Sequence, residues 1–545
     1  MTSKLRIIPI GGLGEIGKNM MVIEYEDDIL IIDAGIMFPE NDMLGVDTII
    51  PDYNYLLDKT DKVRAILVTH GHEDHVGALP HLVKDVPAPI YATKLTAGLI
   101  EVKLQRAGVL GDVALNLIEA GDVFDIGPFT IEPFHVAHSI PDCVGFGITT
   151  PVGLIVFTGD YKFDHTPVDG WPPDFAKLAE FSERGVLCLL ADSTNADRAG
   201  WTRSEMVITE AFDKLFREAK GRIIIGTFAS LISRIQQVVD MSQKYGRKLA
   251  ITGRSMRDNT KMARRLGYLD IPDDMLVDLH QAVNMPDHQV AIMATGTQGE
   301  PMAVMSRLSR SRHRSLSIKK GDTVVFSAHP IPGNEEMVYR VINLLLQRGA
   351  EVLYERIADV HVSGHASQEE MKLMINLVRP QFLIPVHGEL RHLKLHGKLG
   401  QQLGIPADNI AVVENGTPIE LDGHSMKILP RLRGGYVFVE GSSVGEVGWD
   451  VLRDRERLAQ GGVFFAVVPV NNNGDLVGTP EFVTSGFVAR EEANELEEGA
   501  QERVAQTVRS FTGSRDQLHK EIEKSLERYL YDETGRRPLI HVVAK

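Results

Sequence analysis

Short apolar runs separated by turn residues dominate the first 200 residues, and this feature most constrains the fold. The runs include KLRIIPI, MMVIEY, DILIIDAG, AILVTH, FTIEPFHV and LIVFTGD. Runs of this length and composition are typical of β-strands. The segments LPHLVKDV and KLTAGLIEVKLQRAG have helical spacing and lie between the strands. The pattern therefore predicts a layered α/β fold rather than a pure β-sandwich.

The pattern changes after Thr202 and returns near Glu351. In between, the helical segments RSEMVITEAFDKLFREAK, SLISRIQQVVDMSQKYG and DNTKMARRLGYL alternate with the apolar runs RIIIGTF and KLAITG. This alternation indicates βαβ units and a parallel sheet. Short strands such as EVLYERI and FLIPVHGE then resume. We therefore expect a second α/β domain, inserted into the first.

The chain has 545 residues, which is more than one hydrophobic core usually serves. Hydrophobic residues make up 43% and charged residues 24%, as in folded globular proteins. The N-terminal segment has no long apolar stretch, and no run approaches the roughly 20 residues that span a bilayer. These features predict a cytoplasmic protein without a membrane segment. With only two cysteines, a metal would have to be held by histidines and carboxylates.

The net charge of -16 argues mildly against nucleic acid as a partner. Two basic stretches could still supply a local binding surface, although each can also be read as an ordinary solvated face. They contain Arg254, Arg257, Lys261, Arg264 and Arg265, and Arg307, Arg310, Arg312, Arg314, Lys319 and Lys320.

A compact group of metal-binding residue types follows the run AILVTH. His70 and His72 are two residues apart and can face one metal ion, while the next turn directs Asp74 and His75 toward a second ion. A polar loop with chance histidines is the alternative. Four such residues within six positions nevertheless form a specific signal.

Two further residues end apolar runs in the same way, namely His138 in PFHVAHSIPD and Asp160 in LIVFTGD. Two ions about 3.5 to 4 Å apart require a bridging ligand, and Asp160 is the candidate. Asp33 in ILIIDAG is expected to accept the free N–H of a ligating histidine. Such a pair of ions would activate water and stabilise both oxygens of an in-line displacement.

The motifs THGHEDHVGALP and PVHGE, with His138 and Asp160, resemble the metallo-β-lactamase superfamily. ADSTNA and DVHVSGHAS resemble the β-CASP nucleases within it, and GGLGEIGKNM with SGHASQEE is similar to the ribonuclease J family. The resemblance implies an α/β fold: a metallo-β-lactamase αββα sandwich, an inserted α/β β-CASP domain and a small C-terminal α/β domain. The expected ranges are 1–205 and 351–440 for the sandwich, 206–350 for the insert, 441–460 for a linker and 461–545 for the C-terminal domain.

The resemblance also implies roles for individual residues. His70, His72 and His138 would hold one ion, Asp74, His75 and His387 the other, and Asp160 would bridge them. Asp192 would pair with His365, and His365 would act as the general acid. Asp74 would be a further catalytic residue. The ions would be zinc or manganese, with magnesium as a further candidate.

The implied substrate is single-stranded RNA with a 5′-monophosphate end. A phosphate site is expected at His361, Val362, Ser363, Gly364, His365 and Ser230. Asp47 and Glu440 resemble a structural calcium site, although solvated loop acids are the alternative. The C-terminal segment resembles a self-association domain, which implies a homodimer or homotetramer.

The implied activity is degradation and maturation of RNA by 5′-to-3′ exonucleolytic hydrolysis, with endonuclease activity. One alternative is a hydrolase of small thioesters or lactones on the same metal core, which would not need the inserted domain. Another is a catalytically silent scaffold.

The glycines Gly12, Gly14 and Gly17 satisfy the GxGxxG pattern of dinucleotide-binding folds. That pattern requires a helix next, whereas KNMMVIEYEDD reads as a strand.

Overall fold

The computed structural model describes residues 4–299, 302–331, 333–471, 473–513 and 515–545. The chain divides into two units. The larger unit contains residues 1–38 and 48–437, and the smaller contains residues 39–47 and 438–545. The expected domain ranges assigned residues 39–47 to the sandwich, whereas the structure groups them with the C-terminal unit.

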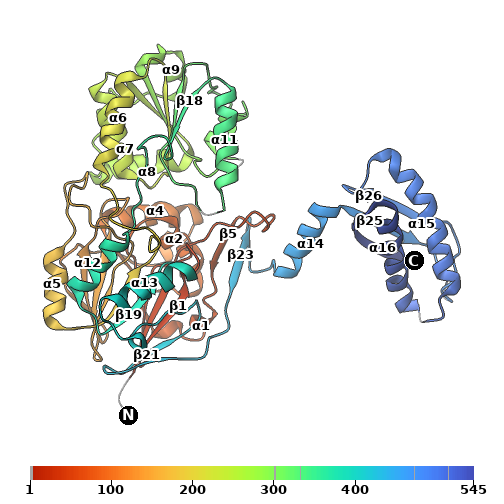
Figure 1. Ribbon diagram of the computed structural model, residues 1–545, viewed down its shortest axis with the longest axis horizontal. Coiled ribbons are helices and arrows are strands. Elements are labelled where there is room, and N and C mark those ends of the chain that lie inside the picture. Colours follow the sequence, from red (N-terminus) through yellow and green to blue (C-terminus); the bar gives the residue numbers. More distant parts are fainter. Residues whose placement is uncertain (1–3, 300–301, 332, 472, 514) are drawn as a thin grey trace. The chain divides into compact units, whose positions relative to one another are not determined.

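Two mixed sheets form the centre of the larger unit (Figure 1). The strands of the first sheet are, in spatial order, β22 (Met426–Ile428), β21 (Ile419–Leu421), β1 (Leu5–Gly11), β3 (Met20–Tyr25), β4 (Asp28–Ile32), β6 (Val63–Leu67), β7 (Ile90–Ala92) and β8 (Leu115–Leu117). Those of the second are β19 (Phe382–Val386), β13 (Val186–Asp192), β12 (Leu154–Phe157), β11 (Val144–Thr149), β10 (Phe129–His135) and β9 (Phe124–Ile126). Strands from both ends of the sequence complete these sheets, as expected for a domain interrupted by an insertion.

The inner faces of the two sheets share one hydrophobic core. Ile23 and Leu67 of the first sheet pack in the same cluster as Phe146, Ile155 and Ile384 of the second, and all five are buried. Burying side chains of this size contributes roughly 1.5–3 kcal/mol each, before the entropy of ordering them is subtracted. This shared core holds the two sheets face to face.

Helices cover the outer faces, so the layers follow the expected αββα order. Helices α3 (Leu79–Asp85) and α4 (Lys94–Ala107) lie beside the first sheet. Helices α5 (Phe175–Arg184), α12 (Gln368–Val378) and α13 (Leu390–Gln402) lie beside the second (Figure 1). Shorter elements complete the sandwich: α1 (Asn54–Leu57), α2 (Glu73–Val76), β5 (Thr48–Pro51), and the paired strands β2 (Leu13–Gly14) and β20 (Gly388–Glu389).

The inserted part has its own parallel sheet, as the alternating pattern predicted. Its strands are β15 (Lys248–Thr252), β16 (Val290–Ala294), β14 (Ile223–Gly226), β17 (Thr323–Phe326) and β18 (Glu351–Tyr354). Its helices are α6 (Met206–Glu218), α7 (Ile232–Lys244), α8 (Arg254–Leu266), α9 (Leu279–Asn284), α10 (Val304–Ser309) and α11 (Glu335–Gln347) (Figure 1).

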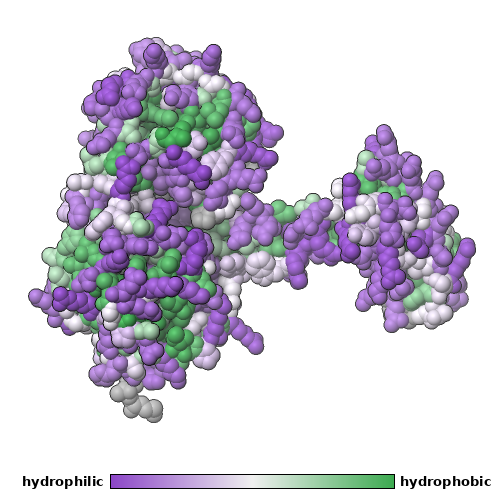
Figure 2. Space-filling model, in the orientation of Figure 1, coloured by the Kyte–Doolittle hydropathy of each residue, from purple (hydrophilic) through white to green (hydrophobic). Residues whose placement is uncertain are grey.

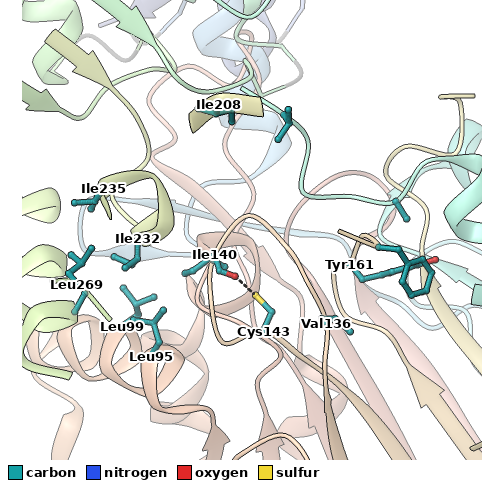
Figure 3. Close-up of a cluster of buried hydrophobic side chains, with 14 of the residues drawn as sticks. Leu95, Leu99, Val136, Ile140, Cys143, Tyr161, Ile208, Ile232, Ile235 and Leu269 are labelled. Atoms are coloured by element: carbon teal, nitrogen blue, oxygen red, sulfur yellow. Dashed lines mark hydrogen bonds between the residues drawn. The ribbon is translucent and has the colours of Figure 1, made fainter. Parts of the chain in front are cut away.

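A hydrophobic contact joins the insert to the sandwich. Leu95 and Leu99 of α4 lie in the same buried cluster as Ile232 and Ile235 of α7 (Figure 3). Next to them, Tyr268 donates a hydrogen bond to a carboxylate oxygen of Asp142, at 2.7 Å. The loop that carries Asp142 also carries His138, so contacts with the insert help to position this segment.

The smaller unit contains a three-stranded sheet and two long helices. β25 (Val463–Val468) pairs antiparallel with β26 (Glu481–Ser485) and parallel with β27 (Leu539–Ala544). The remaining elements are β24 (Ser443–Val444), α14 (Trp449–Gly461), α15 (Arg490–Ser510) and α16 (Arg515–Thr534), and β23 (Tyr436–Glu440) crosses the boundary of the two units. Its own buried cluster includes Phe464, Ala500 and Leu526. Our sequence analysis assigned no helix to α15, because its acidic residues hide the few apolar positions that face the core.

Hydrophilic side chains cover most of the visible face of the smaller unit (Figure 2). No described helix is long and apolar enough to cross a membrane.

The GxGxxG segment is followed by strand β3 rather than by a helix, which confirms the expected strand. Gly12 has a φ of 87°, and a Cβ there would lie 2.2 Å from the side-chain oxygen of Asn19. These glycines therefore serve a tight turn.

Candidate metal and catalytic centre

Three neighbouring strands of the second sheet end in residues that we expect to take part in catalysis or metal binding. β12, β13 and β19 are adjacent and parallel, and Asp160, Asp192 and His387 lie at or just beyond their carboxyl ends. Neighbouring strands are about 4.8 Å apart, so side chains at these ends can meet. The sheet order therefore brings together residues separated by more than 200 positions in the sequence.

Three histidines form the first cluster. The His70 Nε2 atom lies 3.0 Å from His72 Nδ1, which lies 3.2 Å from His138 Nε2. His70 and His72 come from the loop after β6, and His138 follows β10. All three nitrogens lie within 4.8 Å of one another, which suits a single ion.

The second cluster contains Asp74, His75, Asp160 and His387. The Asp74 carboxylate lies 3.6 Å from His75 Nε2 and 3.5 Å from His387 Nε2. One oxygen of Asp160, Oδ2, lies 3.2 Å from His75 Nε2. The same oxygen lies 3.7 Å from His70 Nε2 in the first cluster. Asp160 is therefore the carboxylate that faces both clusters.

Outer hydrogen bonds fix the orientation of the imidazoles. Asp33 accepts from Thr69 N–H at 2.8 Å, and its Oδ2 lies 2.8 Å from His75 Nδ1. His70 Nδ1 lies 3.0 Å from the hydroxyl oxygen of Thr69, which itself donates to Asp33. His138 Nδ1 donates to the carbonyl of Gly364 at 2.7 Å. Asp33 thus supports one histidine of each cluster, directly for His75 and through Thr69 for His70.

The hydrogen bonding of His387 and the pKa values of the histidines in the first cluster are those expected of ligands to divalent ions. His387 Nε2 is buried and has no hydrogen-bond partner among the described residues, although such atoms normally have one. Burial lowers the pKa of His72 to about 4 and lowers the pKa values of His70 and His138 well below the ordinary range. Three neutral imidazoles would then present lone pairs to one another, an arrangement that an ion stabilises.

Asp192 and His365 form a separate pair beside the second cluster. His365 Nδ1 lies 2.8 Å from Asp192 Oδ2 and 3.9 Å from Asp160 Oδ2. Burial by itself would lower the pKa of His365, but Asp192 and Asp160 outweigh this effect and raise it to about 9. The other oxygen of Asp192 accepts from the N–H and hydroxyl of Thr194. At neutral pH His365 is therefore protonated.

The HVSGH segment lies against the first cluster. A Cβ on Gly364 would come within 2.6 Å of the His138 ring, so this contact requires glycine. Asn195 Nδ2 donates to the Ser363 hydroxyl at 2.8 Å and to the His365 carbonyl at 3.0 Å. Val362 is buried. His361 is partly buried, and its buried Nδ1 atom has no hydrogen-bond partner among the described residues.

Ser230 lies in the loop between β14 and α7. It lines a cavity of about 600 Å³ between the sandwich and the insert, together with Gly71, Phe228 and Thr297. None of residues 361–365 lines this cavity. The structure thus brings Ser230 to the junction of the two folds. Nearby, Arg234 donates a hydrogen bond to the carbonyl of Val360, directly before the HVSGH segment, at 3.1 Å, and the role of Ser230 in phosphate binding stays a prediction.

The side chains of Asp47 and Glu440, the two residues expected to bind calcium, each contact another part of the protein. Asp47 accepts a hydrogen bond from Gly441 N–H at 2.7 Å, and Glu440 forms an ion pair with Arg455 at 2.7 Å. Among the described residues, neither belongs to a group of three or more metal-binding side chains. The calcium site stays an untested prediction, and these contacts give it no support.

Several residues that hold the histidines in position were not predicted from the sequence. Asn19 Nδ2 lies 3.1 Å from His75 Nε2, and the Thr202 hydroxyl donates to the His365 carbonyl at 2.7 Å. Asn195 and Thr69 have similar supporting contacts. Thr69 could have been suspected from its place between the strand and His70. Lone asparagines and threonines in loops carry no comparable signal.

Four family models together match most of the chain. A model described as "Metallo-beta-lactamase superfamily" matches residues 13–197, and "Ribonuclease J, beta-CASP domain" matches 220–345. "Zn-dependent metallo-hydrolase RNA specificity domain" matches 349–410, and "Ribonuclease J C-terminal domain" matches 450–545.

Curated relatives match over nearly the full length. Ribonuclease J 1 of Streptococcus pyogenes is 40% identical, covering 99% of this chain and 97% of the relative. Ribonuclease J2 of Bacillus subtilis is 40% identical, covering 99% and 98%. Ribonuclease J of Thermus thermophilus is 43% identical, covering 98% and 94%. A crystal structure of a protein of unknown function from Enterococcus faecalis matches with a TM-score of 0.55 at 16% identity, covering 77% of this chain and all of that one, which supports the fold alone.

Proposed function

The chain belongs to the ribonuclease J family, and we propose from this premise that it degrades and matures RNA as a 5′-to-3′ exonuclease that prefers 5′-monophosphate ends and also cuts internally. Its class is that of a metal-dependent ribonuclease. The alternative of a small thioester or lactone hydrolase is not favoured, because the match includes the insert and the RNA specificity domain.

One observation carries the proposal, namely the position of Asp160 between two ligand clusters. Its Oδ2 atom approaches His75 on one side and His70 and His138 on the other. A hydrolase with a single ion would not need a carboxylate in this place. Two ions with a shared carboxylate are the arrangement that phosphodiester hydrolysis uses.

The residues divide into two ligand sets. The first ion would be held by His70, His72 and His138, the second by Asp74, His75 and His387, and Asp160 would be shared. When bound, such ions activate water and offset negative charge on the phosphate. Imidazole and carboxylate ligands suit both zinc and manganese, with magnesium as a further candidate.

His365 supplies a proton to the leaving group. Hydrolysis adds the oxygen of a water molecule to phosphorus and breaks the bond to the 3′ oxygen, which takes the proton of His365 and leaves as a hydroxyl group. Asp192 keeps His365 protonated, and its ring lies within 3.9 Å of Asp160. A general acid in this place avoids the release of an alkoxide. Backbone N–H groups near Gly364, with the Ser363 hydroxyl, would hold a phosphate.

The test is digestion of one end-labelled RNA prepared with a 5′-hydroxyl, a 5′-monophosphate or a 5′-triphosphate, with zinc, manganese or magnesium. We expect mononucleotide release to be fastest from the monophosphate form. Ser363→Ala should reduce this preference by about tenfold, the effect of roughly one charge-assisted hydrogen bond, and should spare internal cutting. Equal loss in both activities would remove Ser363 from the phosphate site, and absence of cleavage with every metal would contradict the proposed function.

Two further expectations belong to the same proposal. The C-terminal unit, which matches the family's C-terminal domain, would form a homodimer or homotetramer. The protein would act in the cytoplasm, where its RNA substrates are found.

A further inference from the structure

Three exposed aromatic side chains lie beyond the two clusters and take no part in the chemistry derived above. We call His165, Trp171 and Trp201 the aromatic rim. The side chains of Trp171 and Trp201 are 42% and 51% exposed. Exposed single hydrophobic residues are ordinary, so the case depends on how these rings are placed and held.

The aromatic rim occupies loops that also carry catalytic residues. The loop after β12 contains Asp160, His165 and Trp171, and the loop after β13 begins with Asp192 and reaches Trp201. β12 and β13 are adjacent and parallel, so both loops leave the sheet at the same edge. The aromatic rim is therefore attached to the edge at which the clusters form.

Trp171 is held rigidly in its exposed position. Its ring stacks on the His135 ring, with centroids 3.9 Å apart and planes 6° from parallel. His135 is buried, and its Nδ1 atom lies 3.0 Å from the carbonyl oxygen of Pro172, the residue after Trp171. His135 also ends β10, three residues before His138. One face of the indole is thus covered by a ring from the strand that leads to His138.

Trp201 is anchored through its backbone neighbours. Thr202 N–H donates to Glu370 at 2.7 Å, and the carbonyl of Gly200 accepts from Glu369 N–H at 3.1 Å. The Trp201 ring lies 6.3 Å from that of His165, which is nearly parallel to Phe175, with centroids 5.9 Å apart. The hydroxyl of Thr202 holds the carbonyl of His365. The second indole is therefore tied to the general-acid segment.

We propose that the aromatic rim stacks bases of single-stranded RNA next to the scissile phosphate, an inference that rests on the proposed function. Every base has a flat π-face, so pre-positioned rings bind RNA with little sequence preference. Polar residues lie next to the rings: Asp169 accepts a hydrogen bond from Trp171 N–H, and Thr166 donates one to Ser204, which disfavours a continuous apolar protein interface. The charge of Asp169 also repels phosphate, so bases rather than the backbone would face this surface.

The first test compares Trp171→Ala and Trp201→Ala on a 5′-monophosphorylated single-stranded RNA. Each should raise KM by roughly tenfold, as expected for loss of one base stack, with kcat within about twofold. Trp171→Phe should retain most of the affinity because the ring is kept. Trp449→Ala, at a tryptophan 53% exposed in the C-terminal unit, is the matched control and should leave KM unchanged. RNA with an abasic nucleotide at the stacked position should abolish the difference between Trp171→Ala and the parent.

The second test uses tryptophan fluorescence and needs no cleavage. The chain has three tryptophans, so Trp449→Phe leaves the two of the aromatic rim. In the full-length protein without metal, single-stranded RNA should quench their emission, while a duplex of the same sequence should not. Quenching without any cleavage on adding metal would contradict the proposed function but support the stacking site. The stacking site would be overturned if Trp171→Ala and Trp201→Ala left KM unchanged and RNA caused no quenching. A loss of kcat alone in these variants would also overturn it.

Discussion

At the scale of residues, the chemistry depends on which nitrogen of each histidine is engaged elsewhere. His75 and His138 use Nδ1 for Asp33 and Gly364, and this leaves Nε2 for the clusters. His72 presents Nδ1 instead. Supporting hydrogen bonds of this kind orient metal ligands and are costly to remove.

His72→Ala should abolish cleavage, because the first cluster loses one of its three nitrogens. We expect a fall of at least about 1000-fold in kcat/KM, with RNA affinity retained within roughly threefold. Metal analysis and a binding titration, run on the same preparation, measure both effects. His288→Ala changes an exposed histidine on the insert and should leave both unchanged. Normal cleavage by a metal-analysed His72→Ala preparation would contradict the metal assignment.

Asp192→Asn should change the pH dependence of cleavage. A general acid works while protonated, so the rate falls as pH rises through the pKa of His365, which is about 9. Removing the neighbouring charge lowers that pKa, and the alkaline limb should move to lower pH by about one unit or more. The rate should be measured from pH 6 to 10. Asp197→Asn, which removes the partner of Arg391, is the control and should leave the limb in place.

At the scale of elements, strand ends and close backbone approaches build the centre. Asp160, Asp192 and His387 follow three parallel neighbours, and His387 adopts a φ of 49°, which is unusual for a residue with a side chain. Asp33 has a φ of 61° at the equivalent point after β4. Such strained positions persist only where surrounding contacts compensate.

Gly364→Ala should displace His138. The new methyl group would meet the imidazole at 2.6 Å, and moving a ligand by even 1 Å can reduce activity by about 100-fold. Metal content should fall below two ions per chain, as measured by elemental analysis. Gly111→Ala has no neighbour within 4 Å and is the matched control. A variant with full metal content and full activity would show that the segment moves aside freely.

At the scale of the whole molecule, two units have separate cores. The sandwich and insert share one buried cluster, whereas the C-terminal unit has its own sheet and its own apolar interior. This separation is consistent with chemistry in the larger unit and association through the smaller one.

Deletion of residues 450–545 should produce a monomer that still binds metal. The deleted part contains the helices and sheet of the separate core, and the clusters lie wholly within residues 70–387. Light scattering would measure the mass, and elemental analysis the metal. If the shortened chain kept the mass of the full-length assembly, association would have to occur through the larger unit. Loss of metal from a folded monomer would show that the units are coupled.

Much of the fold and part of the centre could be predicted from local patterns. Apolar periodicity indicated the strands and the inserted parallel sheet, because burial of alternate or continuous apolar residues depends on short stretches. The loop from His70 to His75 was recognisable because its ligands are contiguous. Helix α15 was missed because its sparse apolar positions are meaningful only against the core that they contact.

Composition and motifs in the amino-acid sequence thus determined the layers, the metal-binding residue types and the family resemblance. Only the tertiary structure decided which distant residues converge, which imidazole nitrogen faces each cluster, and that Ser230 lies at the junction of the sandwich and the insert. The physical reason is that convergence depends on strand order and register across the sheet. Those long-range pairings are set by packing of the whole core, which no short stretch of sequence contains.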